Sequence, residues 1–305
     1  MYVTGGIGSS RHNEGFTEDY DLPNLDAYCE TCASVGMVYW NQRMNQFTGD
    51  SKYIDVLERS MYNGALAGVS LAGDRFFYVN PLESNGDHHR QAWYGCACCP
   101  SQISRFLPSI GNYIYGTSDK ALWVNLFIGN TTEVTIDGKK VVMKQETDYP
   151  WDGLVKLTVT SEQPLGKELR IRIPGWCKSY TLSVNGNKVD STTDKGYTVI
   201  KEWKTGDLIV LNSRPARAAK HGQARPATRT AGLLPRRDGQ RERLCRPRTD
   251  AHLLIRGQRR TGQPGWHPLN QSHIEWTNTT FHSLLCLGQP QSRQDESMDR
   301  LSRIT

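Results

Sequence analysis

The sequence predicts an α+β multidomain protein, in which a helical part is followed by an all-β unit and an irregular tail. Over residues 1–112 apolar residues recur mostly at three- and four-residue steps in the predicted helices, as is typical of amphipathic helices. From residue 113 to 212 short alternating segments are separated by turn residues. Residues 213–305 contain no Tyr and no Val. A chain of 305 residues has room for roughly two domains, so we expect boundaries at these composition changes.

The helical part contains three segments with a helical pattern. Helices are predicted over residues 24–47, 51–67 and 101–112, with an extended piece over residues 74–83. Asn24 is a suitable N-cap for the first helix. The first two helices are joined by a short turn and should form a helical hairpin. Pro108 is expected to kink or shorten the third helix.

The second part has the pattern of a β-sandwich. Six apolar and alternating segments are predicted strands: residues 122–127, 133–136, 155–159, 169–173, 180–184 and 207–211. The dipeptides Asp137-Gly138 and Asn185-Gly186 follow such segments, and both predict tight hairpins because a two-residue turn needs positive φ. Recurrent strands of this length with these turns favour a two-sheet sandwich over residues 113–212.

The charge is distributed unevenly along the chain. Residues 211–305 hold 16 Arg and 1 Lys against 7 acidic residues, whereas residues 1–210 hold 20 basic and 24 acidic residues. The positive net charge of +6 therefore belongs to the tail, and the acidic front disfavours a nucleic-acid-binding protein. Three interpretations of the tail stay open, namely a disordered basic segment, a nucleic-acid arm and a shifted reading frame. The loss of Tyr and Val favours the shifted frame.

Neither a membrane span nor a secretory signal is predicted. The sequence contains no apolar run of about 18 residues, and its first residues lack the basic start and apolar stretch of a signal peptide. Clustered free thiols favour a reducing compartment or a metal site. We therefore expect a cytoplasmic protein with no membrane partner.

Five of the eight cysteines lie within nine positions, in residues 29–32 and 96–100. Thiolates and a carboxylate are ligands that zinc prefers, and four residues could form a tetrahedral site: Glu30, Cys32, Cys98 and Cys99. The adjacent cysteines 98 and 99 are poorly placed to bond to each other, so both could bind one metal, or one could act as a nucleophile. Upstream, Glu14 and Glu18 lie in a glycine-rich loop and could supply a proton to a leaving group.

Several ordered motifs together resemble glycoside hydrolase family 127, whose founding activity is a β-L-arabinofuranosidase. The motifs are residues 2–10 (YVTGGIGSS), 14–17 (EGFT), 19–24 (DYDLPN), Tyr28, 30–32 (ETC), 95–100 (GCACCP), 149–153 (YPWDG) and 169–176 (LRIRIPGW). The resemblance covers about residues 1–212. It implies the last portion of an (α/α)6 catalytic barrel over residues 1–112, followed by a β-sandwich.

The resemblance also implies roles for individual residues. The zinc ligands would be Glu30, Cys32, Cys98 and Cys99. The family's nucleophile falls on Cys98 and its acid/base on Glu14, and Tyr78 corresponds to a tyrosine that lines the sugar pocket. The substrate would be an arabinofuranoside oligosaccharide. Because the family's chains are longer, we expect this chain to begin inside the catalytic domain, and a catalytically inactive fragment with a structural zinc site is the alternative.

Overall fold

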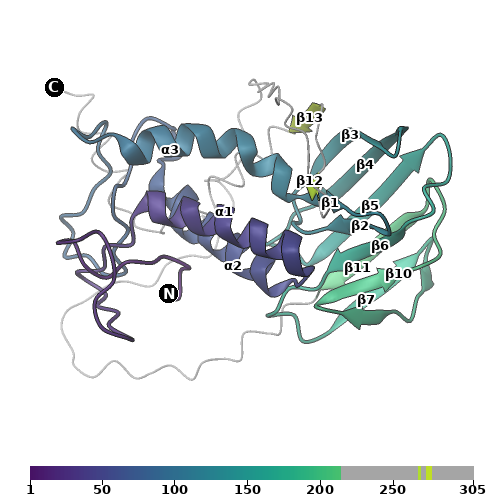
Figure 1. The fold of residues 1–305 in the computed structure, drawn as a ribbon, viewed down its shortest axis with the longest axis horizontal. Coiled ribbons are helices and arrows are strands. Elements are labelled where there is room, and N and C mark those ends of the chain that lie inside the picture. Colours follow the sequence, from purple (N-terminus) through teal and green to yellow (C-terminus); the bar gives the residue numbers. More distant parts are fainter. Residues whose placement is uncertain (214–266, 269–272, 277–305) are drawn as a thin grey trace, which may run out of the picture.

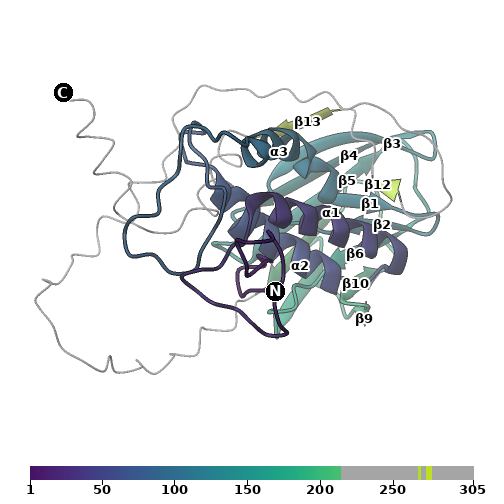
Figure 2. The ribbon, with the colours of Figure 1, turned by 60° about the vertical axis from the view of Figure 1, so that its left-hand side comes forward.

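The computed structural model describes residues 1–213, 267–268 and 273–276, and it places three α-helices beside two β-sheets (Figure 1). The helical elements are α1 (Thr31–Thr48), α2 (Lys52–Ser60), the π-helix η1 (Met61–Ala65), the 3-10 helix η2 (Leu66–Gly68), α3 (Cys98–Phe106) and the 3-10 helix η3 (Leu107–Tyr113). Both views show α1 and α2 side by side, as expected for the predicted hairpin (Figures 1 and 2). Among the described residues no helix combines the length and apolarity needed to cross a membrane.

The first helix begins later than its sequence pattern predicts. Residues 24–30 are not helical, and Cys29 adopts a φ of 38° that an α-helix does not allow. The backbone N–H of Cys29 donates to Gly8 O at 2.9 Å, and the N–H of Asn80 donates to Cys29 O at 3.2 Å. These contacts with distant loops replace helical hydrogen bonds, so the prediction of Asn24 as N-cap was wrong and Glu30 precedes the first helical turn.

The second predicted helix changes its winding at Met61, where α2 gives way to η1 and η2. Two glycines allow this stretch to approach α1 closely. A Cβ at Gly64 would lie 2.4 Å from Ser34 Oγ, and one at Gly68 would lie 2.6 Å from Thr31 Cγ2. Both positions therefore require a residue without a side chain if the two segments are to keep this separation.

The third helix begins at Cys98 rather than at residue 101, so it includes both adjacent cysteines. Pro100 lies in its first turn, where a missing N–H costs no intrahelical bond. The α-helix becomes a 3-10 helix at Leu107, directly before Pro108, in agreement with the predicted shortening. The extended piece at residues 74–83 forms isolated bridges rather than a regular strand.

From Tyr115 onward the described strands form two mostly antiparallel sheets. The strands are β1 (Tyr115–Thr117), β2 (Ala121–Val124), β3 (Asn130–Ile136), β4 (Lys139–Thr147), β5 (Leu154–Ser161), β6 (Glu168–Arg172), β7 (Tyr180–Val184), β8 (Asn187–Lys188), β9 (Thr192–Asp194), β10 (Tyr197–Ile200), β11 (Leu208–Ser213), β12 (His267–Pro268) and β13 (His273–Trp276). One sheet has the order β12-β1-β2-β6-β10-β9, and the other β13-β3-β4-β5-β11-β7-β8. The pair β2–β6 is parallel.

Both predicted hairpin turns are confirmed. Asp137 and Gly138 have φ values of 50° and 76° between β3 and β4, and Asn185 and Gly186 have φ values of 52° and 82° between β7 and β8. The predicted tail contributes the short strands β12 and β13, which pair with β1 and β3. Its other residues, and with them the three interpretations of the tail, lie outside the described part of the chain.

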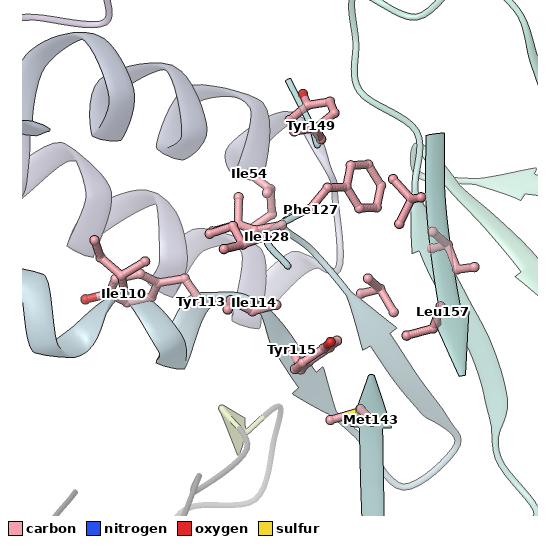
Figure 3. Packing of buried hydrophobic residues seen from close by; sticks show 14 of the residues in the cluster. Ile54, Ile110, Tyr113, Ile114, Tyr115, Phe127, Ile128, Met143, Tyr149 and Leu157 are labelled. Atoms are coloured by element: carbon pink, nitrogen blue, oxygen red, sulfur yellow. The ribbon is translucent and has the colours of Figure 1, made fainter. Parts of the chain in front are cut away.

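One hydrophobic cluster joins the helices to both sheets. Figure 3 shows members of this cluster from five elements, Ile54 of α2, Ile110 of η3, Tyr115 of β1, Met143 of β4 and Leu157 of β5, and all five side chains are buried. Removing this apolar surface from water is the main favourable contribution to packing the two parts together. The α+β composition agrees with the prediction, whereas the partial (α/α)6 barrel stays a prediction.

A buried arginine fixes the sheets against α2. The Arg172 side chain is fully buried, and its Nη1 and Nη2 lie 2.6 Å from Asp55 Oδ1 and from Glu58 Oε1. Its Nε donates to the carbonyl of Asn125 at 2.6 Å. Tyr149 donates its hydroxyl to the other Glu58 oxygen at 3.1 Å. This network connects β6 and the loops that carry Asn125 and Tyr149 to α2.

Candidate metal centre and catalytic site

The predicted metal ligands lie where two helices begin. Glu30 immediately precedes α1 and Cys32 is in its first turn, while Cys98 and Cys99 are the first two residues of α3. The extended piece contacts both helix starts. The Thr31 N–H donates to the carbonyl of Tyr78 at 2.9 Å, and the Cys99 thiol donates to the same carbonyl at 3.7 Å. Side chains near two converging helix N-termini can therefore meet at one point, although they lie 66 or more residues apart in sequence.

The four side chains form one compact cluster. The Cys32 and Cys99 sulfur atoms are 3.4 Å apart, and those of Cys98 and Cys99 are 3.8 Å apart. Glu30 Oε1 lies 3.4 Å from the sulfur of Cys98 and 3.4 Å from that of Cys99. All four ligand atoms lie within 4.8 Å of one another. A tetrahedral zinc with bonds of about 2.3 Å to sulfur separates its sulfurs by about 3.8 Å, so these donors fit such an ion.

The thiols of the cluster differ in their surroundings. Burial raises the pKa of Cys98 to about 11. Contact with Cys32 and burial raise the pKa of Cys99, while the hydrogen bond with Cys99 lowers the pKa of Cys32. The cluster thus resists carrying several thiolates in the absence of a positive charge. A divalent cation reverses that preference, because it favours the deprotonated form of each sulfur that binds it.

Tyr78 reaches the cluster from the extended piece. Its hydroxyl lies 2.9 Å from Cys98 Sγ and donates to Cys96 Sγ at 3.9 Å. The hydroxyl of Tyr94 accepts a hydrogen bond from the backbone N–H of Tyr78 at 3.2 Å, and the two rings pack edge to face. Contact with Cys98 and burial raise the pKa of Tyr78, so that it stays a neutral phenol. The structure thus brings Tyr78 to the sulfur of the predicted nucleophile.

Glu14 lies in an exposed loop outside the cluster. It adopts a φ of 53°, and the loop is closed by the Ser9 N–H, which donates to Gly15 O at 2.9 Å. The Tyr28 hydroxyl donates to Glu14 Oε1 at 2.8 Å, and the Tyr28 ring centroid is 6.4 Å from that of Tyr78. Glu14 is therefore connected to the cysteine cluster through two tyrosines.

Sequence patterns gave no functional role to Tyr28 or Cys96. Tyr28 matched the apolar spacing of the predicted first helix, but it lies in the preceding loop, where its side chain is buried and burial raises its pKa. Cys96 lies in the motif of residues 95–100 and is not one of the predicted ligands, and it is exposed beside Tyr78. Both belong to the motifs that resemble the family, but their contacts join separate loops, so the motifs alone did not indicate what either side chain does.

Comparison with known proteins identifies both parts of the chain. Residues 1–112 match the model of the β-L-arabinofuranosidase GH127 catalytic domain, and residues 121–213 match that of the GH127 middle domain. The chain is 41% identical over 217 residues to a non-reducing end β-L-arabinofuranosidase from Bifidobacterium longum subsp. longum. The aligned stretch covers 66% of this chain and 32% of that protein.

Solved structures agree with this assignment. The structure of a GH127 β-arabinofuranosidase superposes on this chain with a TM-score of 0.67 and 45% sequence identity. The superposed part covers 70% of this chain and 36% of the chain of that enzyme. A GH127 β-L-arabinofuranosidase from Geobacillus stearothermophilus T6 is 47% identical with a TM-score of 0.66, over the same shares of the two chains. The chain thus spans about a third of the length of these relatives. On the agreement of both family models with these relatives, the chain belongs to glycoside hydrolase family 127.

Proposed function

We propose that this chain is a retaining glycoside hydrolase that releases L-arabinofuranose or a related sugar, with Cys98 as nucleophile and Glu14 as acid/base. The observation that carries the proposal is the convergence of Cys98 with three further metal-type ligands within 4.8 Å. The names of the relatives supply the sugar, since they are β-L-arabinofuranosidases. We assign the chemistry to residues 1–112, as part of an (α/α)6 barrel, and a supporting role to a β-sandwich over residues 113–212.

The proposed cofactor is one Zn²⁺, held by Glu30, Cys32, Cys98 and Cys99. When bound, zinc would keep its thiolate ligands deprotonated at neutral pH. The chain contributes the closely spaced donors and the partial burial that shields them from water. Glu30 and Cys99 are the buried members of the set, and Cys98 is only partly buried.

Two displacements at the anomeric carbon would give retention of configuration. In the first, the Cys98 sulfur bonds to that carbon, the glycosidic C–O bond breaks, and Glu14 gives its proton to the departing oxygen. In the second, Glu14 takes a proton from water, the water oxygen bonds to the carbon, and the C–S bond breaks to release Cys98 as thiolate. A thiolate here takes the place of the carboxylate nucleophile that most retaining glycosidases use.

The test is turnover of 4-nitrophenyl β-L-arabinofuranoside by the purified zinc-loaded chain. We expect about one zinc per chain, a product of retained configuration by NMR, and loss of activity in Cys98→Ser. Cys177→Ser is the matched control, because Cys177 contacts the Ser179 carbonyl away from the cluster. Full activity of Cys98→Ser would refute the mechanism. Zinc binding without turnover would instead favour an inactive fragment with a structural zinc site.

A further inference from the structure

Tyr28 is the side chain that the proposed mechanism leaves without a role, although it touches the proposed acid/base directly. Its hydroxyl donates to Glu14 Oε1 at 2.8 Å. We infer that Tyr28 is a positioning residue for Glu14. The Tyr28 hydroxyl occupies Oε1 of Glu14 and thereby leaves Oε2 as the oxygen that carries and delivers the proton. This inference rests on the proposed function, in which Glu14 is the acid/base.

The two partners of this hydrogen bond differ in how firmly they are held. Tyr28 is buried, and its backbone carbonyl accepts from the Asn80 N–H at 3.3 Å. Gly8 lies close to its ring, since a Cβ built at Gly8 would lie 3.9 Å from Tyr28 Cδ1. Glu14 is exposed. A fixed donor beneath an exposed carboxylate restricts the positions that the carboxylate can take, which a solvent-exposed glutamate would otherwise sample freely.

The loop backbone prepares Glu14 for this contact. The Ser9 and Ser10 N–H groups donate to Gly15 O at 2.9 and 3.2 Å, and Gly15 N–H donates to Asn13 Oδ1 at 3.2 Å. Between these anchors Glu14 has a φ of 53°, a conformation that few residues other than glycine adopt. The loop thus directs this side chain toward Tyr28 at some conformational cost.

The hydrogen bond also decides which carboxyl oxygen can be acidic. A carboxyl group that accepts a strong hydrogen bond on one oxygen holds its proton on the other, because an O–H on Oε1 would compete with the tyrosine for the same lone pairs. Tyr28 therefore acts on proton transfer to the leaving group rather than on attack by Cys98. The Tyr28 ring centroid lies 6.4 Å from that of Tyr78, whose hydroxyl contacts the proposed nucleophile.

The experiment compares Tyr28→Phe with the parent chain, both zinc-loaded, on two aryl β-L-arabinofuranosides. Phenol is a basic leaving group that needs protonation, whereas 2,4-dinitrophenolate leaves without it. We expect kcat/KM to fall about tenfold or more for the phenyl glycoside and less than about threefold for the dinitrophenyl glycoside. Tyr2→Phe is the control, since its hydroxyl bonds to the Pro23 carbonyl of the same loop region. An equal loss on both substrates, or no loss, would overturn the inference.

A second readout does not depend on turnover. In chains labelled with ¹³C at the glutamate carboxyl, the Glu14 signal is identified by its disappearance in Glu14→Gln. Tyr28→Phe is expected to shift that signal, and Tyr2→Phe to leave it in place. If the parent chain has no activity, the proposed function fails for this chain, and the carboxyl signal alone decides the positioning contact. An unshifted Glu14 signal in Tyr28→Phe would refute it.

Discussion

The phenol oxygen of Tyr78 lies 2.9 Å from Cys98 Sγ, closer to that sulfur than the Glu30 carboxylate at 3.4 Å or the Cys99 sulfur at 3.8 Å. Tyr78 is not a member of the metal-type cluster. The proposed nucleophile therefore has a hydrogen-bonding partner that is separate from the groups that would hold a metal, and the two roles can be tested independently.

Tyr78→Phe is expected to lower kcat/KM about tenfold or more, because a hydrogen bond to a charged group is worth about 1.5–3 kcal/mol. The zinc content should stay unchanged, since the ring keeps its place and no ligand is lost. Activity assays and metal analysis of the same preparation measure both quantities. Tyr180→Phe, which removes an exposed hydroxyl on β7, is the control. Parallel loss of zinc and activity in Tyr78→Phe would contradict a separate role.

Removal of metal is expected to lower the melting temperature, because an ion that binds the folded chain stabilises it by mass action. Zinc at a hundredfold excess over its Kd contributes about 2.7 kcal/mol. Differential scanning fluorimetry before and after chelation, and after zinc is restored, measures the effect. Cys32→Ser should lose most of the zinc-dependent shift, whereas Cys177→Ser should keep it. Equal shifts in both variants would mean that zinc binds elsewhere.

Arg172→Met is expected to cost about 3–5 kcal/mol in the free energy of unfolding. The change leaves Asp55 and Glu58 without their buried cation, and breaking a buried ion pair on one side costs this much. Arg170→Met on the same strand is the matched control. Arg170 pairs with the partly exposed Glu168 and Asp194, so its loss should cost about 1 kcal/mol or less.

Urea unfolding of both variants measures these costs. Similar values for Arg170→Met and Arg172→Met would show that the buried network does not hold the sheets to α2. The m-value should stay constant in both, because neither change alters the surface exposed on unfolding to a large extent.

His88 is expected to make the folded chain lose stability in mild acid. Its ring stacks on Phe77 at 4.6 Å and its Nε2 contacts the Val79 carbonyl at 3.0 Å, and burial lowers its pKa. Because the pKa of His88 is lower in the folded state, the neutral ring stabilises the folded chain at pH values above the ordinary histidine pKa of about 6.5. This contribution to the free energy of unfolding is lost as the pH falls through the lowered pKa.

The measurement is the free energy of unfolding of the parent chain and His88→Gln at about pH 7.5 and pH 5. The difference between the two pH values should be smaller in the variant. His12→Gln, on the exposed N-terminal loop, should behave like the parent. A pH dependence that His88→Gln leaves unchanged would exclude His88 as its source.

Some features of this chain could be predicted because they depend on short stretches of sequence. The turns at Asp137-Gly138 and Asn185-Gly186 follow from residues that tolerate positive φ. Pro108 predicts the change of winding at the end of α3. The start of α1 could not be predicted, because residues 24–30 have a helical pattern but their backbone bonds to Gly8 and Asn80.

By itself, the sequence determined the chemical nature of the candidate site, since thiols and a carboxylate in short motifs predict a metal centre whatever the fold. It also named the four residues that meet in the cluster, Glu30, Cys32, Cys98 and Cys99. Only the tertiary structure decided that Tyr28 bonds to Glu14, that the Tyr78 hydroxyl contacts Cys98, and that Arg172 is buried against α2. The physical reason is separation along the chain. Arg172 and Glu58 lie 114 residues apart, and a local pattern carries no information about a partner that packing alone brings near.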